Sequence, residues 1–337
     1  MITSESTTGE AAITVADLGE FGLIAAIRAE LPPDPADLLG AGDDGAVLPA
    51  PDGRVVASTD LLIEGRHFRR DWSAAADVGV KAAAQNLADI AAMGAHPTAL
   101  LFGLAIPADL AAEWVLEATR GLAAECRRAG ALVAGGDVTS ADTIMLAITA
   151  LGSLAGLAPV TRAGARAGDV IALSGPVGQS AAGLAVLQAG GAGPAGQPGH
   201  SGLAVLVAAH LRPQPDYPAG PQAAAAGATS MIDVSDGLLA DLGHIADASG
   251  VCLNVRADSL PGTAALAAAA SGLGTDWRRW ALAGGEDHAL AATFGSAAVV
   301  PAAWTVIGEV RSGAGVLVDS QPWDGTTGWD HFRSPGV

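Results

Sequence analysis

Short acidic segments, each set among glycines or other small residues, are the feature that most limits how this chain can fold. A fold that gathers carboxylates must neutralise their mutual repulsion, and hard divalent cations do so through oxygen ligands. Magnesium also keeps several waters and completes its shell with substrate phosphates. The pattern therefore predicts magnesium-dependent phosphate chemistry. The segments are Gly42-Asp43-Asp44-Gly45, Ser58-Thr59-Asp60, Asn86-Leu87-Ala88-Asp89, Gly135-Gly136-Asp137, Asp233-Val234-Ser235-Asp236-Gly237 and Gly284-Gly285-Glu286-Asp287.

The composition allows a large core and argues against two kinds of partner. The 337 residues suffice for two domains of ordinary size, and 50% of them are hydrophobic. A formal charge of −18 lacks the basic footprint that nucleic acid requires. The most apolar stretch, residues 143–160, is rich in Thr, Gly and Ala, which favours a strand and loop over a membrane span. Residues 1–12 lack the pattern of a signal peptide, so we expect a cytoplasmic protein.

Lysine and cysteine usage excludes three further classes of site. Lys81 is the only lysine, and no G-x-x-x-x-G-K-[ST] sequence occurs, which excludes a P-loop kinase. Cys126 and Cys252 are far apart and form no C-x-x-C pair. Neither a disulfide framework nor a thiolate zinc site is therefore expected.

The alternation of periodic segments predicts two α+β halves. Several strands are spaced as hairpins, which favours mixed sheets packed with helices over a doubly wound parallel sheet. The pattern restarts near Val160, which predicts a disordered terminus (1–13), an N-terminal domain (14–159) and a C-terminal domain (160–337). Asp17 is the expected N-cap of the first helix, with Glu20 as its box partner. Helices are predicted at 17–30, 74–93, 109–129, 178–188 and 237–249, strands at 54–61, 98–106, 131–134, 144–154, 169–174, 230–234, 251–255, 289–293 and 306–310, and a linker or loop at 189–202.

Acidic residues at the ends of apolar elements are the first candidates for a site. Thr59 and Asp60 end an apolar strand, and strand ends aim side chains into a shared crevice. Asp89 interrupts an otherwise apolar helix face, where an unpaired buried carboxylate is costly. It either binds a cation or caps a neighbouring element. Asp43 can face a metal while its neighbour Asp44 caps or orients, although an ordinary Gly-Asp turn is the alternative.

The remaining acidic segments combine carboxylates with turn residues. Gly135 and Gly136 follow a predicted strand and let the backbone approach an anion, although such a pair also makes an ordinary turn. Asp233 and Ser235 share one strand face, and Asp236 begins the turn into a helix. An N-cap explains one of these two acids, but not both together with the flanking Ser and Gly.

In their order along the chain, these segments resemble those of thiamine-monophosphate kinases, a family in the superfamily of aminoimidazole ribonucleotide synthetase and selenophosphate synthetase. The resemblance runs from about Asp17 to Phe332 and implies a two-domain α+β fold of the aminoimidazole ribonucleotide synthetase type. Besides the six segments named above, it includes His67-Phe68, the continuation of the third segment to Ala95, and Trp329-Asp330-His331-Phe332.

The resemblance implies ATP-dependent phosphorylation of thiamine monophosphate to thiamine diphosphate, the last step of thiamine diphosphate biosynthesis, with release of ADP. It also implies several Mg²⁺ ions, a homodimer formed by the N-terminal domain, and active sites in a cleft that involves the C-terminal domain. Carried over residue by residue, it assigns Asp43, Ser58, Thr59, Asp60, Asp89, Asp137, Asp233 and Asp236 as metal ligands, Gly136, Arg162 and Ser235 to the ATP site, and His67, Glu286 and Trp329 to the thiamine side.

The chemistry so implied is direct in-line phosphoryl transfer between two anions, with magnesium screening both. The acceptor phosphate is already ionised near neutral pH, so we assign no general base and interpret His67 as a substrate contact. Two places depart from the family pattern. Asp137 is followed by Val138-Thr139-Ser140-Ala141, without the usual arginine, and Asp216 and Tyr217 stand where an arginine often follows the Arg-Pro-x-Pro stretch.

Two alternatives stay open at this point. Another ATP-dependent synthetase of the superfamily is one, although Cys126 and Cys252 do not lie where selenophosphate synthetase has its reactive residue, and the chain does not end in the cysteine of the hydrogenase-maturation relative. A non-catalytic homologue that binds a nucleotide or a metal is the other. Release of ADP that depends on thiamine monophosphate discriminates between these alternatives.

Overall fold

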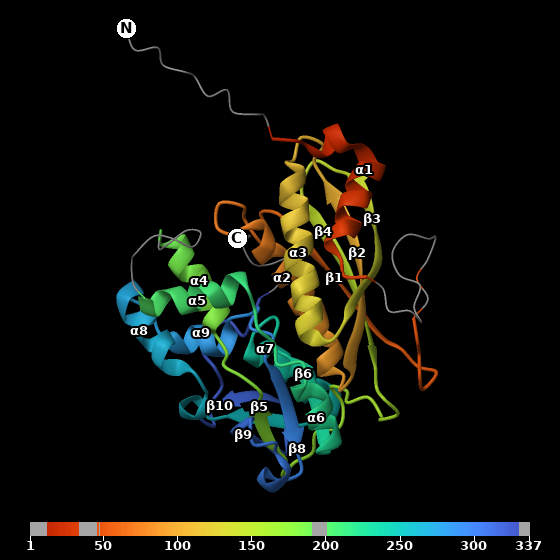
Figure 1. Cartoon of the computed structure of the whole chain (residues 1–337). Helices are drawn as coiled ribbons and strands as arrows, with labels where there is room; N and C mark the ends of the chain where they lie inside the picture. The colour runs from red at the N-terminus through yellow and green to blue at the C-terminus, as the bar shows by residue number, and fades with distance from the viewer. Residues whose placement is uncertain (1–11, 34–45, 47, 191–200, 330–337) are drawn as a thin grey trace.

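The computed structural model describes residues 12–33, 46, 48–190 and 201–329, and in these ranges the strands form two mixed sheets (Figure 1). Helices pack against the sheets, which confirms the predicted α+β class. We call the part built on the first sheet the N-terminal unit and the part built on the second the C-terminal unit. The expected boundary near residue 160 lies between Ser153, where the first sheet ends, and Val170, where the second begins. The division into domains 14–159 and 160–337 stays a proposal.

The N-terminal unit is a four-stranded sheet with helices on one face. Buried and half-buried residues alternate along strand β4, which lies second in the sheet. They alternate because one face of the sheet is covered by helices and the other is not. The parallel pair β2–β3 makes the sheet mixed. The strand order is β1 (Val56–Ile63), β4 (Met145–Ser153), β2 (His96–Ile106) and β3 (Leu132–Ser140), and the helices are α1 (Val15–Glu30), α2 (Ala75–Ala92) and α3 (Ala112–Ala129).

Helices α2 and α3 pack closely because each presents a glycine to the backbone of the other. A Cβ atom at Gly79 would lie 1.9 Å from the carbonyl oxygen of Ala118, and one at Gly121 would lie 2.1 Å from that of Ala76. Any side chain at either position would therefore force the helices apart. α3 ends at Gly130, whose left-handed backbone conformation (φ 76°) makes it a natural C-cap.

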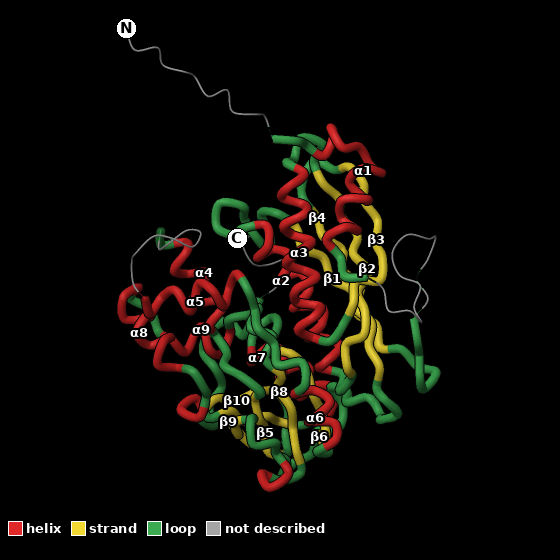
Figure 2. Tube along the Cα trace, viewed as in Figure 1, coloured by secondary structure: helices red, strands yellow, loops and turns green. Residues whose placement is uncertain are grey.

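The C-terminal unit is a six-stranded sheet with a group of helices at one end (Figure 2). The strand order is β10 (Gly315–Val318), β7 (Cys252–Val255), β9 (Thr305–Arg311), β5 (Val170–Leu173), β8 (Leu290–Phe294) and β6 (Ala228–Asp233). The grouped helices are α4 (Gln179–Gln188), α5 (Ser201–Leu211), α8 (Thr263–Leu273) and α9 (Trp277–Ala283). The unit also contains α6 (Ala219–Ala225), α7 (Leu238–Ser249) and the short 3-10 helices η1 (Ala257–Ser259) and η2 (Ala297–Val299).

Helix α2 touches both units and carries much of the contact between them. A Cβ atom at Gly220 of α6 would lie 1.9 Å from the carbonyl oxygen of Ala91, so α6 lies directly against α2. Two α2 residues also form ion pairs with the C-terminal unit: Asp77 with Arg212, and the buried Lys81 with Glu286 at 2.8 Å.

Helix α3 adds a contact through the tyrosine that departs from the family pattern. Tyr217 is buried and donates a hydrogen bond of 2.5 Å to Glu125, and the guanidinium of Arg128 lies 4.5 Å from the centre of its ring. Tyr217 therefore makes an apolar and a polar contact between the two units.

The structure corrects two local predictions. The N-cap of α1 is Thr14 and not Asp17, which is its box partner; Thr14 pairs with Ala111 and so starts the helix earlier. Gly135, Gly136 and Asp137 lie inside strand β3 and not in a turn after it. A register irregularity at Leu100 and Leu101 of β2 lets the strand continue past the glycines.

Several elements of the C-terminal unit were not predicted: α5, α6, α8, α9 and β10. Helices α5 and α8 consist almost wholly of Ala, Val, Leu and Gly, so they lack the polar stripe that reveals an amphipathic helix. Residues 191–200 of the predicted linker lie outside the described ranges. In the described ranges, no helix reaches the length and hydropathy needed to cross a bilayer.

Candidate active site

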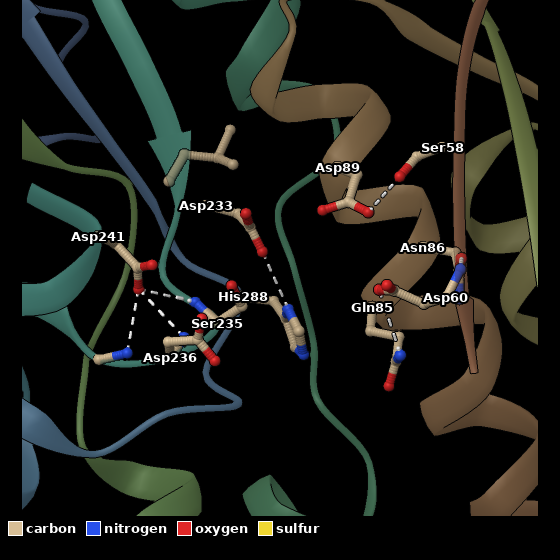
Figure 3. Close-up of polar contacts among 12 residues, drawn as sticks. Ser58, Asp60, Gln85, Asn86, Asp89, Asp233, Ser235, Asp236, Asp241 and His288 are labelled. Carbon is tan, nitrogen blue, oxygen red and sulfur yellow. Dashed lines mark hydrogen bonds and ion pairs between the residues drawn. The ribbon is translucent and has the colours of Figure 1, made fainter. Parts of the chain in front are cut away.

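A cavity of about 390 Å³ lies between the two units, and carboxylates of both units face it (Figure 3). We call it the interunit cavity. Its polar wall consists of Ser58, Asp60 and Asp89 from the N-terminal unit and Arg162, Asp233, Ser235 and His288 from the C-terminal unit. This volume suits a small-molecule site. Residues of three of the six acidic segments, those at 58–60, 86–89 and 233–237, therefore meet at this cavity.

Strand β1 and helix α2 position the N-terminal wall. Ser58 and Asp60 pair with Ala150 and Ile148, two fully buried residues, so their side chains lie on the sheet face that α2 covers. Ser58 donates a hydrogen bond of 2.6 Å to Asp89, one turn before the end of α2. The backbone N–H of Asp60 donates to Asn86 at 3.0 Å. The period of a strand and the pitch of a helix thus bring the acids together.

Asp89 is the most perturbed carboxyl of this wall. Burial raises its pKa from 3.8 to about 7, the charge of Asp233 adds to this rise, and the hydrogen bond from Ser58 opposes it. The surroundings of Asp89 therefore favour its neutral form unless a cation is present. In the described residues the carboxylate of Asp89 accepts a hydrogen bond from the Ser58 hydroxyl, and cation binding by Asp89 stays a prediction.

Strand β6 and the loop after it position the C-terminal wall. Asp233 is the last residue of β6, is buried, and lies 3.2 Å from His288. The loop that follows is held by Asp241 of α7, whose Oδ2 accepts the backbone N–H groups of Ser235, Asp236 and Gly237 at 3.0–3.2 Å. Neither Asp233 nor Asp236 caps α7, because its N-cap is Gly237 without a side-chain hydrogen bond.

The Gly-Gly-Glu-Asp segment lies next to this loop and is tied to it by backbone hydrogen bonds. Glu286 N–H donates to Ser235 at 2.7 Å, and His288 N–H donates to Val234 at 2.9 Å. Both Glu286 and His288 have left-handed backbone conformations (φ 65° and 54°), which non-glycine residues adopt rarely and mostly at functional sites. Asp287 points the other way and accepts the N–H groups of Gly178 and Ser180 at the start of α4.

Glu286 forms the charged link between this segment and α2. Burial tends to raise its pKa, but the charge of Lys81 is the largest of the opposing causes, and together they lower the pKa to about 2. Glu286 is therefore ionised at neutral pH. His210 is buried, and burial together with the Lys81 charge lowers its pKa to about 3, so it is neutral.

The side-chain atoms that could act as metal ligands in the interunit cavity suit a hard divalent cation. All of the N-terminal wall donors are oxygens, and in the described ranges neither Asp60 nor Asp89 forms an ion pair with a basic side chain. In those ranges no three His, Cys, Asp or Glu side chains are close enough together to share one ion. Water and phosphate oxygens would therefore complete the shell of a bound ion, which is the usual behaviour of Mg²⁺.

The structure brings some predicted residues together and leaves others apart. Ser58, Asp60, Asp89, Arg162, Asp233 and Ser235 line the interunit cavity. Asp236 lies beside Ser235 (Figure 3), and its carbonyl accepts the backbone N–H of Trp329 at 2.9 Å. Thr59 faces the opposite side of the sheet, where its hydroxyl donates to the Ile148 carbonyl at 2.8 Å. Asp43 lies outside the described residues.

Three more predicted residues lie away from the lining. Gly136 and Asp137 are exposed on β3, and a Cβ atom at Gly136 would lie 2.0 Å from the carbonyl oxygen of Phe102. The predicted close approach of the backbone at Gly136 is thus made to β2 in this structure. His67 accepts the N–H of Ile63 on Nδ1 at 3.0 Å, and its carbonyl accepts a bond from Lys81.

Sequence reasoning missed Asp241, His288 and the pairing of Lys81 with Glu286. A signal for Asp241 exists, because it lies four residues after Gly237 and so reaches back over the first turn of α7. His288 directly follows the Gly-Gly-Glu-Asp segment. A lone buried lysine predicts an acidic partner, although the sequence does not show which one.

Comparison with known proteins places the chain among relatives that match it over nearly its whole length. The profile of the AIR synthase related protein N-terminal domain matches residues 42–154. The thiamine-monophosphate kinase of Mycobacterium tuberculosis (strain H37Rv) is 47% identical over 338 residues, covering 99% of this chain and 98% of the relative. That of Corynebacterium glutamicum is 43% identical and covers 95% of both chains.

Solved structures agree with these sequence relatives. The crystal structure of thiamine-monophosphate kinase from Stenotrophomonas maltophilia matches with a TM-score of 0.78 and 36% identity, over 89% of this chain and 96% of the other. A structure of AaThiL complexed with AMPPCP and TMP matches with a TM-score of 0.75 and 29% identity, over 97% and 100%. The expected fold type is thereby confirmed.

Proposed function

This chain belongs to the thiamine-monophosphate kinase family, and from that premise we propose that its interunit cavity is where ATP phosphorylates thiamine monophosphate. Identity of 47% over 338 residues to a thiamine-monophosphate kinase favours this function over that of another synthetase of the superfamily, and the assay below decides for or against a non-catalytic homologue. The observation that carries the proposal is that Asp60, Asp89 and Asp233, from both units, face one cavity. Substrates held there would be enclosed by both units.

The carboxylates would serve this reaction by holding Mg²⁺, which neutralises charge on both phosphate groups when it is bound. Ser58, Asp60, Asp89, Asp233 and Ser235 are the residues that would hold it. Their own role is to fix the position of the donor and acceptor phosphates so that they lie in line. We propose the same role for Asp43, Asp137 and Asp236, and for Thr59 only through its backbone, because its side chain faces away.

No side chain is needed to remove a proton from the acceptor, because a phosphate monoester is ionised at neutral pH. We therefore propose direct in-line transfer without a general base. Arg162 lines the interunit cavity and is the cation placed to meet the ATP phosphates, together with Ser235 and the backbone of Gly136.

The thiamine end is proposed to lie near Glu286, His67 and Trp329. The ionised carboxylate of Glu286 suits the cationic thiazolium ring. Lys81 links two of these residues, because it pairs with Glu286 and donates to the His67 carbonyl at 3.1 Å. Trp329 is held against the cavity loop through Asp236 and offers an indole that can stack on a cationic ring.

A homodimer through the N-terminal unit is supported by the sheet face that the helices leave uncovered. On that face Leu61 and Leu101 are 47% and 38% exposed, and Thr59 and Thr149 contact each other between them. Apolar strands presented in this way suit pairing with a second copy. The cytoplasmic location expected from the sequence stays a prediction.

The test is formation of thiamine diphosphate by the purified protein from ATP and thiamine monophosphate in the presence of Mg²⁺. We expect ADP release that requires thiamine monophosphate and stops when the metal is chelated, with free thiamine a poor acceptor. Equal turnover of free thiamine, or ATP hydrolysis indifferent to the acceptor, would contradict the proposal. Trp329→Ala should raise the Michaelis constant for thiamine monophosphate and leave that for ATP nearly unchanged.

A further inference from the structure

His288 is a buried histidine of the interunit cavity for which the mechanism above gives no role. Its side chain is 6% exposed and lines the cavity beside Asp233. One ring nitrogen, Nδ1, lies 3.2 Å from Oδ2 of Asp233. The other, Nε2, is buried and has no hydrogen-bond partner among the described residues.

The carboxylate decides which nitrogen carries the proton. An ionised aspartate only accepts hydrogen bonds, so Nδ1 is the donor in this contact. The geometry of this contact thus directs the Nδ1–H of His288 at the carboxylate of Asp233.

The backbone holds this ring firmly in place. His288 has a left-handed conformation (φ 54°), and its N–H donates to Val234 at 2.9 Å. On the next residue, the Ala289 carbonyl accepts the N–H of Val234 at 2.8 Å. Both bonds are made by Val234, the residue after Asp233, so the ring and the carboxylate are fixed at the same end of β6 (Figure 3).

We propose that His288 is the positioning residue for Asp233: its Nδ1–H holds the carboxylate in the orientation that faces Asp89, and so sets the affinity of the interunit cavity for divalent cations. The inference rests on the proposed function, since it takes Asp233 to be a metal ligand. Hydrogen bonds that orient ligating groups typically change metal affinity by about 10- to 100-fold when they are removed.

Three substitutions separate the two ring nitrogens. His288→Asn places an amide N–H near the position of Nδ1, His288→Gln places one near Nε2, and His288→Leu supplies none. Asn also tolerates a left-handed backbone better than most residues, so it adds no strain. His244→Gln is the matched control, because His244 is an exposed histidine of α7 outside the cavity lining.

The measurement is direct binding of Mn²⁺ to each protein with a non-hydrolysable ATP analogue, followed by electron paramagnetic resonance. We expect His288→Gln and His288→Leu to weaken Mn²⁺ binding by about 10-fold or more, and His288→Asn and the control to stay within about 3-fold of the parent. At saturating Mg²⁺ the turnover of His288→Gln should recover, because positioning acts on metal affinity.

Two results would overturn the proposal without touching the proposed function. If all three variants bind Mn²⁺ as the parent does and only their melting temperatures fall, His288 is a packing residue. If His288→Gln keeps the affinity and His288→Asn loses it, Nε2 is the working atom. Absence of Mn²⁺ binding by the parent protein would instead overturn both this inference and the metal role assigned under the proposed function.

Discussion

Asp89 is a carboxylate whose surroundings oppose its charge in the metal-free protein. Its pKa of about 7 in the fold, against 3.8 as the ordinary value, means that the folded protein keeps a proton that the unfolded chain releases between these two values. The free energy of unfolding must therefore fall as the pH rises from about 4 to about 7, and stay level above that range. Asp241 and Asp287, whose pKa values burial also raises to about 7, act in the same direction.

We expect Asp89→Asn to lack turnover and yet to be more stable than the parent when no metal is present. The gain should appear at pH 8, where the buried carboxyl of the parent is ionised, and become small near pH 4, where that carboxyl is protonated in the fold. Thermal unfolding in chelator at the two pH values measures it, and a rise of a few degrees at pH 8 is expected. Loss of stability at both pH values would show that the carboxylate is needed for the fold, and full activity would show that it is not a metal ligand.

The ion pair between Lys81 and Glu286 should respond unequally to removal of its two members. Lys81 is 3% exposed and Glu286 is 32% exposed, so only the glutamate can turn to water when its partner is lost. Glu286→Gln should therefore lower the free energy of unfolding by about 3–5 kcal/mol, and Lys81→Met by clearly less. Urea unfolding of both variants and of the double variant checks this order, and equal losses would contradict it.

Among single residues, the sequence predicted site residues where an acidic side chain interrupts an apolar pattern. Asp89 on an apolar helix face and Asp233 at the end of a strand could be predicted, because each conflicts with its local surroundings unless a function retains it. Asp241 and His288 could not, because their importance lies in which neighbour they touch. Asp241 accepts three backbone N–H groups, and its spacing from Gly237 allows such a contact without showing that it is made.

Among the elements, the contact between α2 and α3 depends on two glycines. We expect Gly79→Ala to destabilise the protein by more than about 2 kcal/mol, because its Cβ would lie 1.9 Å from the Ala118 carbonyl oxygen. Gly243→Ala on α7 is the matched control: nothing lies within 4 Å of its Cβ, and the change should stabilise by about 0.4–1 kcal/mol. Denaturant unfolding distinguishes the two, and equal effects would mean that the helices can separate without cost.

Elements with a clear period were predicted, and those without one were not. In strand β1 and helices α2 and α3 the apolar residues recur with the period of a strand or a helix. These elements could therefore be predicted from the sequence. Strand β3 was ended too early, because two consecutive glycines favour a turn locally, whereas pairing with β2 keeps the strand going. Pairing with a distant strand can override the local preference of a segment, and the sequence of that segment alone does not reveal it.

For the whole molecule, we expect the uncovered sheet face to join two copies. Leu101→Asp should convert the protein to a monomer, because a carboxylate at a 38% exposed position of that face would be buried in the dimer. Val299→Asp, at a 46% exposed position of the C-terminal unit, is the control and should stay dimeric. Light scattering over a range of concentrations measures this, and a dimeric Leu101→Asp would place the interface elsewhere.

The contacts of helix α2 with both units affect how many phosphate groups the acceptor can carry. Lys81, which pairs with Glu286, and Asp89 are eight residues apart on this helix, a rise of about 12 Å. In the proposed arrangement Lys81 lies near the thiazolium end of the acceptor and Asp89 near its phosphate end. The spacing of these two residues on α2 therefore limits the length of the acceptor that fits. Thiamine diphosphate is longer than this spacing allows, so the product would leave without receiving a third phosphate.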